Sequence, residues 1–384
     1  MNNSQSSRPI AIACGGTGGH LFPGLAVAHE LLAHGCRVTL LVSPKDGDQQ
    51  AVKRLLGMEV MTLPAVGLKR GGEIAFLRGF CRSYRAAKKL FQTRCPQAVL
   101  AMGGFTSAPP VLAAKTCGAQ SFLHESNTIP GRANRWLSWL VNRAFVGFPV
   151  AARGLHNNHL TTTGTPVRPQ FRLRDAAECR AALGLHPERP VLAVIGGSQG
   201  ASGINDLLMQ SLPLLARSVP MLQWFHLTGP SDAARVEQAY CDLGLNAVVH
   251  PFFAEMELVL GAATAAISRA GASSLAEFAA MQVPALLVPY PAATENHQFH
   301  NARAFVETGA ARLLLQEQAT AESLVQSLLD LIESKVVRDT TQKALARWHA
   351  PRAAEQIAEA ILESIMESEP RRAAVGQTPA SAIR

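Results

Sequence analysis

The strongest constraint on the fold is a pattern that occurs twice in the chain: a short apolar strand, a glycine-rich loop and a helix. The first copy has Pro9 to Cys14, the loop GGTGGH, and apolar residues at helical spacing from Leu21 to Ala33. The second has Val191 to Ile195, the loop GGSQGA, and Ala201 to Ala216. Short, nearly continuous apolar runs are typical of strands buried on both faces of a parallel sheet. The repeated pattern therefore predicts two α/β domains.

Further apolar runs of strand length follow each copy. They are Arg37 to Ser43, Ala98 to Met102 and Gln120 to His124 after the first copy, and Gln223 to Leu227, Ala247 to His250, Ala265 to Ser268 and Ala285 to Val288 after the second. Turn residues from Thr161 to Pro190 mark the join. We expect domains at 1–165 and 166–365, and a disordered tail at 366–384 because that segment lacks apolar periodicity. The predicted binding site is an interdomain cleft at the carboxyl ends of the strands.

Composition limits the classes of partner and compartment. Lysine and arginine number 36 against 28 acidic residues, and the net charge of +8 suits a phosphate-rich ligand, nucleic acid or an anionic membrane. Seven cysteines without a C-x-x-C favour a reducing compartment. The N-terminus is too polar for a signal peptide. A non-enzymatic sugar sensor of the periplasmic type would need one, which counts against that alternative.

The two glycine loops are candidate anion sites. Gly15 to His20 lies between a strand and a helix, where main-chain N–H groups can approach a phosphate or a sugar edge. It matches neither G-x-G-x-x-G nor a P-loop. Gly196 to Gly200 formally matches G-x-S-x-G, so the alternative function is an α/β-hydrolase with Ser198 as nucleophile, Glu277 as orienting acid and His297 as base. A single hydrolase sheet would not need the first half of the chain.

A third strand-to-helix segment is rich in hydroxyls. In Ser268 to Glu277, the side chains of Ser273 and Ser274 lie at the expected helix start, and Glu277 can accept hydrogen bonds from two vicinal ribose hydroxyls. The alternative is a capping box between Ser274 and Glu277. Downstream, the amides in Asn296 to Ala302 could read sugar hydroxyls or cap a helix. Neither H-E-x-x-x-H at His29 to His34 nor the turn Asp46-Gly47-Asp48 has the character of a metal site, so none is predicted.

A basic and partly aromatic stretch spans residues 68–91. Its cations are Lys69, Arg70, Arg78, Arg82, Arg85, Lys88 and Lys89, and they alternate with Phe76, Leu77, Phe80, Tyr84, Leu90 and Phe91. A helix of this composition can bind an anionic membrane surface. A solvated helix face is the alternative.

Several motifs together resemble one family. GGTGGH, GGFTSAP, HESN, GTPVR, GGSQGA, Arg269 to Glu277 and HQFHNA occur in the order and spacing of the MurG family of N-acetylglucosaminyltransferases, over residues 8–365. The resemblance implies a GT-B fold of two Rossmann-like domains, with UDP-N-acetylglucosamine as donor and lipid I as acceptor. It also implies inverting transfer in peptidoglycan synthesis, no cofactor, no nucleic acid, and peripheral attachment to the cytoplasmic face of the inner membrane. Thr165 stands where the family usually has asparagine.

The resemblance also implies roles for individual residues. Thr17, Gly18 and Gly19 would line the cleft, Asn127 would approach the N-acetylglucosamine, and Arg168 and Ser198 would lie near the diphosphate. The backbone of Phe253 would meet uracil, and Gln298 would read the sugar. The segment that would wrap the phosphates and the ribose is Ala272, Ser273, Ser274, Leu275, Ala276 and Glu277.

Inverting transfer requires a base for the acceptor hydroxyl and stabilisation of the departing UDP. His20 is the candidate base, because an imidazole can accept a proton near neutral pH. Glu125 is the alternative base, or the residue that orients the acceptor. Helix N-termini and Arg168 can neutralise the diphosphate, so we expect transfer without a metal ion.

Overall fold

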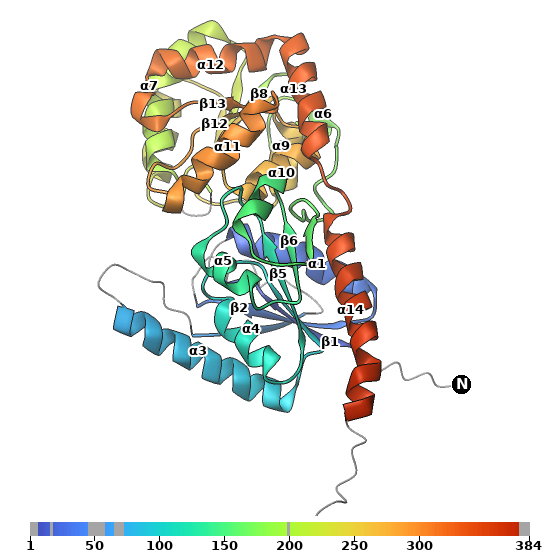
Figure 1. Ribbon diagram of the computed structural model, residues 1–384. Helices are drawn as coiled ribbons and strands as arrows, with labels where there is room; N and C mark the ends of the chain where they lie inside the picture. The colour runs from blue at the N-terminus through green and yellow to red at the C-terminus, as the bar shows by residue number, and fades with distance from the viewer. Residues whose placement is uncertain (1–6, 16–17, 45–57, 65–72, 198–199, 376–384) are drawn as a thin grey trace, which may run out of the picture. The chain divides into compact units, whose positions relative to one another are not determined.

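Two compact α/β units make up the chain in the computed structural model (Figure 1). It describes residues 7–15, 18–44, 58–64, 73–197 and 200–375. The first unit contains the chain up to Ser126, then Pro130–Pro166, and the chain from Arg352 onward. The second unit contains Asn127–Ile129 and Val167–Pro351.

The first unit is built on a parallel sheet of seven strands in the order β3-β2-β1-β4-β5-β6-β7. The strands are β1 (Pro9–Ala13), β2 (Arg37–Val42), β3 (Glu59–Thr62), β4 (Ala98–Ala101), β5 (Gln120–Glu125), β6 (Arg143–Val146) and β7 (Leu160–Thr162). The helices are α1 (Gly18–Ala33), α3 (Glu73–Thr93), α4 (Ala108–Lys115), α5 (Arg132–Ser138), the 3-10 helix η1 (Pro149–Gly154) and α14 (Ala353–Val375).

Alternation along the strands puts apolar side chains on both faces of this sheet. Ile10 and Ile12 of β1 pack in one cluster with α1 and α14. Ala11 and Ala13 point to the opposite face and pack in a second cluster with residues of α3, α4 and α5. Because both faces are covered, the strands are apolar almost throughout, as predicted for a buried parallel sheet.

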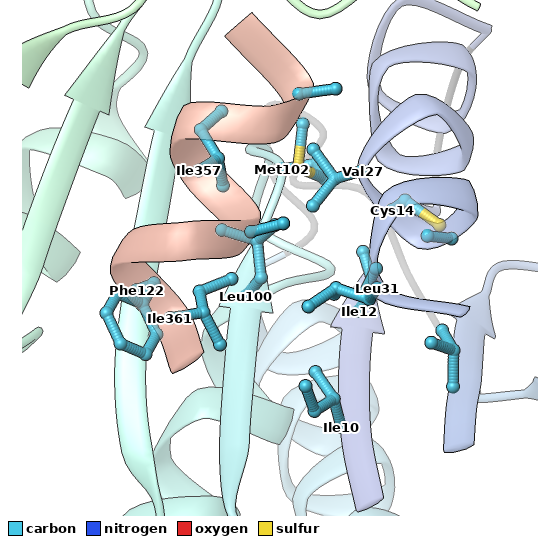
Figure 2. Close-up of a cluster of buried hydrophobic side chains, with 14 of the residues drawn as sticks. Ile10, Ile12, Cys14, Val27, Leu31, Leu100, Met102, Phe122, Ile357 and Ile361 are labelled. Carbon is cyan, nitrogen blue, oxygen red and sulfur yellow. The ribbon is translucent and has the colours of Figure 1, made fainter. Parts of the chain in front are cut away.

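The C-terminal helix α14 belongs to the first unit, although most of the chain before it belongs to the second. Figure 2 shows Ile357 and Ile361 pointing from α14 toward Leu100 of β4, and both isoleucines are fully buried. The division of the chain therefore differs from the predicted domain at 166–365, because the residues after Arg352 bury their apolar side chains on the N-terminal sheet. The tail also begins later than expected, since residues 366–375 continue α14.

The second unit is built on a parallel sheet of six strands in the order β10-β9-β8-β11-β12-β13. The strands are β8 (Val191–Ile195), β9 (Gln223–Leu227), β10 (Ala247–His250), β11 (Ala265–Ser268), β12 (Ala285–Leu287) and β13 (Arg312–Leu313). The helices are α6 (Ala176–Ala182), α7 (Ser202–Ser218), α8 (Ala233–Asp242), α9 (Met256–Ala262), α10 (Ala272–Met281), α11 (His297–Glu307), α12 (Ala321–Glu333) and α13 (Lys335–Trp348), with 3-10 helices η2 (Thr294–Asn296) and η3 (Gln316–Gln318).

The core of the second unit is also divided by its sheet. Leu192 and Val194 of β8 pack with residues of α7, α8 and α12. Val191 and Ala193 point to the other face and are likewise fully buried. The unit thus has an apolar core of its own, in the arrangement of a Rossmann-like domain.

Each sheet reverses its strand order at one place. In the first unit this switch point lies between β1 and β4, whose last residues Ala13 and Ala101 are paired. In the second it lies between β8 and β11, where Ile195 pairs with Ser268. Ligands of open parallel sheets bind at the carboxyl ends of strands at such a point. The prediction of two Rossmann-like units with parallel sheets is confirmed. Among the described residues, no helix combines the length and the apolar character needed to span a membrane.

Candidate functional site

The switch point of the first unit brings two glycine loops together. Gly15 follows β1, and a Cβ there would lie 2.5 Å from the backbone nitrogen of Ser43, so the position requires glycine. The hydroxyl of Thr106, in the loop after β4, donates to the carbonyl of Gly15 at 2.7 Å. Ser107 of the same loop donates to the carbonyl of Ala13 at 3.1 Å. These bonds fix the loop after β4 against the loop after β1.

His20 lies in the first turn of α1, and its imidazole packs on the backbone of two glycines. A Cβ on Gly103 would lie 2.8 Å from Cε1 of His20, and one on Gly104 would lie 3.5 Å from its Nε2. Both glycines have positive φ, +113° and +75°. The sequence placed Gly18, Gly19 and His20 in the loop before the helix, whereas the structure has them in the first turn of α1. Thr17 lies outside the described residues.

Glu125 ends β5 and is only 2% exposed. Its Oε2 accepts hydrogen bonds from the side-chain amide of Asn134 at 2.7 Å and from the backbone N–H of Gly131 at 3.0 Å. Gly131 is the N-cap of α5, where a carboxylate is favourable. These contacts favour an orienting role for Glu125 over that of a base.

His124 precedes Glu125 and is a polar residue whose role sequence reasoning did not assign. Burial lowers the pKa of its imidazole to about 4, with a smaller contribution from His20. Because the ring is neutral at physiological pH, Nε2–H can donate to the carbonyl of Gly164 at 3.0 Å while Nδ1 accepts from Ser126 at 3.2 Å. His124 therefore ties the end of β5 to the segment that leaves the unit at Pro166.

The switch point of the second unit also carries two loops. Gly196 follows β8, and a Cβ there would lie 2.6 Å from the backbone nitrogen of Ala201. Gly200 has φ of +77°, and its Cβ would overlap the carbonyl oxygen of Thr228. Both glycines are thus needed for the tight turn into α7. Ser198, the nucleophile of the hydrolase alternative, lies outside the described residues.

The loop after β11 leads into α10, whose N-cap is Gly271. Ser274 is therefore inside the helix, so the alternative of a capping box between Ser274 and Glu277 is wrong. Glu277 lies one turn further and is 3.6 Å from the guanidinium of Arg168. Their side chains are only 14% and 13% exposed. Burial raises the pKa of the Glu277 carboxyl to about 7, against the opposing effect of Arg168.

The remaining predicted residues of the segment lie on the same turns of α10. Ala272 and Leu275 are buried, whereas Ser273, Ser274 and Ala276 are half-buried. Arg269, which sequence reasoning left without a role, donates to Gln316 at 2.7 Å and to the carbonyl of Val288 at 3.0 Å. Burial lowers the pKa of its guanidinium. Arg269 thus links the loop after β11 to the end of β12 and to the start of η3.

Two predicted sugar-reading amides also belong to the second unit. Asn127 lies in the short Asn127–Ile129 segment and accepts from Asn301 of α11 at 3.0 Å. Gln298 begins the same helix region, and its Oε1 accepts the backbone N–H of Tyr290 at 2.9 Å. Phe253, after β10, packs on Phe225 with ring centroids 5.2 Å apart.

In the described structure, the two remaining residues of the hydrolase alternative each contact another group. His297 is half-buried at the start of α11 and its Nδ1 bonds the carbonyl of Thr294 at 2.7 Å. Glu277 lies against Arg168.

Within the described residues, no group of three or more histidines, cysteines or acidic residues is arranged to hold a metal ion.

Two Rossmann-like units with glycine loops at their switch points form the GT-B fold, and two family models identify the class of protein as a glycosyltransferase. Residues 10–146 match the glycosyltransferase family 28 N-terminal domain, and residues 191–357 match the C-terminal domain of that family. The crystal structure of Acinetobacter baumannii MurG superposes with a TM-score of 0.72 at 27% identity, covering 93% of this chain and 99% of that chain. The calicheamicin glycosyltransferase CalG4 shares the fold, with a TM-score of 0.65 at 18% identity over 93% of this chain and 99% of that one.

Curated relatives are similar over nearly the whole chain. A Pelobacter propionicus protein is 36% identical in an alignment of 366 positions that covers 89% of this chain and 97% of the relative. A Synechocystis protein is 35% identical over 365 residues, or 94% of this chain and 98% of the relative. Both are named UDP-N-acetylglucosamine--N-acetylmuramyl-(pentapeptide) pyrophosphoryl-undecaprenol N-acetylglucosamine transferase. The chain therefore belongs to the MurG family of glycosyltransferases, and the hydrolase alternative finds no support.

Proposed function

We propose that this protein transfers N-acetylglucosamine from UDP-N-acetylglucosamine to the 4-hydroxyl of the muramoyl sugar of lipid I, undecaprenyl-pyrophosphoryl-MurNAc-pentapeptide. The product is lipid II, with inversion at the anomeric carbon. The observation that carries the proposal lies in the second unit, where Glu277 of α10 contacts Arg168 and the loop before α10 is joined to Asn127 through Asn301. A nucleotide sugar requires a carboxylate that accepts hydrogen bonds from the two ribose hydroxyls, a cation for the diphosphate and an amide for the sugar.

The donor is bound by the second unit in this proposal. Glu277 accepts hydrogen bonds from the ribose hydroxyls, while Arg168, Ser198 and the N-terminus of α10 meet the diphosphate. The backbone of Phe253 meets uracil, and Gln298 and Asn127 read the sugar. The dipole of α10 and the Arg168 cation neutralise the leaving diphosphate, so transfer proceeds without a metal ion.

The acceptor is bound by the first unit, with Thr17, Gly18 and Gly19 next to its reacting end. His20 takes the proton of the 4-hydroxyl as the oxygen forms a bond to the anomeric carbon. The bond from that carbon to UDP breaks, and the electron pair leaves with the diphosphate. Glu125 orients this region through Asn134 and Gly131.

The test is incubation with radiolabelled UDP-N-acetylglucosamine and a short-chain lipid I analogue, with and without a chelator. We expect label in the lipid under both conditions. In His20→Ala, turnover should fall by about a hundredfold or more, the range for loss of a general base. Affinity for UDP should change little. Chelator-sensitive transfer would contradict the metal-independent proposal, and unchanged turnover would remove His20 from the mechanism.

The same proposal places the protein peripherally at the cytoplasmic face of the inner membrane, attached through residues 68–91. On α3, Ile74 and Leu77 are 68% and 60% exposed, so two large apolar side chains one turn apart face water. Exposed cations accompany them on the helix, namely Arg78, Arg82, Arg85, Lys88 and Lys89. Apolar residues beside cations fit an anionic lipid surface. Lys69 and Arg70 lie outside the described residues.

A further inference from the structure

The side chain of Asn301, in α11, is completely buried and makes four hydrogen bonds inside the second unit. Its Oδ1 accepts the backbone N–H and the hydroxyl of Thr128, both at 2.9 Å. Its Nδ2 donates to Oδ1 of Asn127 at 3.0 Å and to the carbonyl of Ala270 at 3.2 Å. Asn301 thus joins the Asn127–Ile129 segment to the loop that precedes α10.

Backbone chemistry fixes which way the Asn301 amide faces. The N–H of Thr128 can only donate, so the atom of Asn301 that faces it is oxygen. The carbonyl of Ala270 can only accept, so the other atom is the NH₂ group. Since two main-chain groups determine the orientation, a flip of this buried amide would leave a donor facing a donor and an acceptor facing an acceptor.

The orientation of Asn301 in turn determines that of Asn127. Because the NH₂ of Asn301 donates toward Asn127, the atom of Asn127 that faces it is the carbonyl oxygen. The NH₂ of Asn127 is on the opposite side of its amide. Asn127 is half-buried, whereas Asn301 and Thr128 are buried.

We propose that Asn301 is a positioning residue that sets the amide orientation of Asn127, so that Asn127 presents N–H donors to an oxygen acceptor of the donor sugar. This inference rests on the proposed function, in which Asn127 reads the N-acetylglucosamine. Asn301 itself acts through Asn127 and does not touch the sugar. The oxygen acceptor is the acetamido carbonyl, which accepts an amide N–H and cannot donate in return.

Asn301→Asp tests the inference because it changes the orienting donor into an acceptor. A carboxylate at residue 301 still accepts from Thr128 but attracts the NH₂ of Asn127, which turns the Asn127 amide over. Asn127→Asp is the second variant: one carboxylate oxygen still accepts from Asn301, while the other replaces the donor that faces the sugar. This variant keeps the buried bond intact and therefore tests the inference even if Asn301→Asp does not fold.

The readout is calorimetric affinity for UDP-N-acetylglucosamine, UDP-glucose and UDP, which needs no acceptor. Both variants should bind UDP-N-acetylglucosamine about tenfold more weakly, the effect of one lost hydrogen bond, while UDP affinity changes less than about twofold. Because UDP-glucose lacks the acetamido group, the loss should occur with UDP-N-acetylglucosamine alone. A ring hydroxyl can donate as well as accept and would pair with the new acceptor, so an equal loss with UDP-glucose would contradict the inference.

Two further variants separate positioning from general stability. Thr128→Val removes one bond to Asn301 but keeps the backbone N–H, so we expect a lower melting temperature and unchanged sugar affinity. In an Asn127→Ala background, Asn301→Asp should cause no additional loss of sugar affinity. Unchanged binding of UDP-N-acetylglucosamine in the two aspartate variants, or an equal loss for UDP, would overturn the inference. A wild-type protein that binds no UDP-N-acetylglucosamine would instead contradict the proposed function.

Discussion

At the scale of single residues, the position of the His20 imidazole depends on Gly103, because the ring packs where a side chain at that residue would be. We expect Gly103→Ala to lower turnover by about a hundredfold, because a Cβ 2.8 Å from Cε1 would displace the ring by a large part of an ångström. Gly104→Ala is the matched control: it also has positive φ, but its Cβ would be 3.5 Å from His20, an ordinary contact. Turnover measured with saturating donor checks the difference. Equal losses in both variants would show that backbone strain, not displacement of His20, is responsible.

The raised pKa of Glu277 predicts that donor binding depends on pH. Its pKa in the folded protein is about 7, above the ordinary 4.5, mainly because of burial. The folded state therefore binds more protons than the unfolded state between these pH values, and the contribution of Glu277 to stability falls as pH rises through that window. Donor binding has the opposite trend, because the ionised carboxylate is the better acceptor for two ribose hydroxyls.

We therefore expect affinity for UDP-N-acetylglucosamine to fall by up to about tenfold from about pH 8 to about pH 6. Glu277→Gln should bind more weakly at the higher pH and lose this dependence. Calorimetric titrations of both proteins across the range provide the measurement. The same slope in the variant would assign the pH dependence to another group.

The sequence was informative for residues whose role depends on neighbours along the chain. The glycines around Gly15 and Gly196 were predicted because a strand, a tight turn and a helix follow in order. The roles of Asn301 and Arg269 were not, because their partners are remote: Thr128 is 173 residues from Asn301, and Gln316 is 47 from Arg269. The HQFHNA motif shows that an amide side chain is present at Asn301, but only the fold shows that it bonds the backbone of Thr128 and Ala270.

At the scale of elements, the exposed apolar face of α3 predicts membrane binding that salt only partly removes. Ile74→Ser with Leu77→Ser should reduce sedimentation with anionic vesicles by more than about tenfold, since burial of each side chain contributes about 1.5–3 kcal/mol. Val336→Ser is the control, because Val336 of α13 is 75% exposed and lies in the second unit. High salt should weaken binding of the wild-type protein by screening the cations. Sedimentation of the double variant at the wild-type level would contradict the role of α3.

Predictability of the strands followed their apolar content. The strands of both switch points were predicted, because β1, β4, β8 and β11 are continuous apolar runs. The strands β3, β6, β7 and β13 were missed: β3, β7 and β13 are half-buried or exposed along their whole length, and β6 begins with the half-buried Arg143. Such short runs carry too little periodicity to be separated from loops.

At the scale of the whole molecule, the first unit is discontinuous along the chain, and no local pattern could reveal this. The apolar residues of α14 indicate that one face of the helix is buried, but they do not indicate which of the two sheets covers it. In the structure they complete the face that contains Ile10, Ile12, Leu100 and Phe122. The N-terminal unit therefore depends on residues made after the entire second unit.

A fragment ending at Pro166 should consequently be much less stable than the same unit in the full chain. It retains all seven strands but exposes the surface that Ile357 and Ile361 cover, and loss of each buried isoleucine costs about 2–5 kcal/mol. Urea denaturation, followed by far-ultraviolet circular dichroism, should show a low midpoint that rises when a peptide of residues 352–375 is added. The matched peptide with Ile357→Asp and Ile361→Asp should leave the midpoint unchanged, because it cannot fill the apolar face. If the fragment alone has the stability of the unit in the full chain, α14 is an appendage and the first unit folds without it.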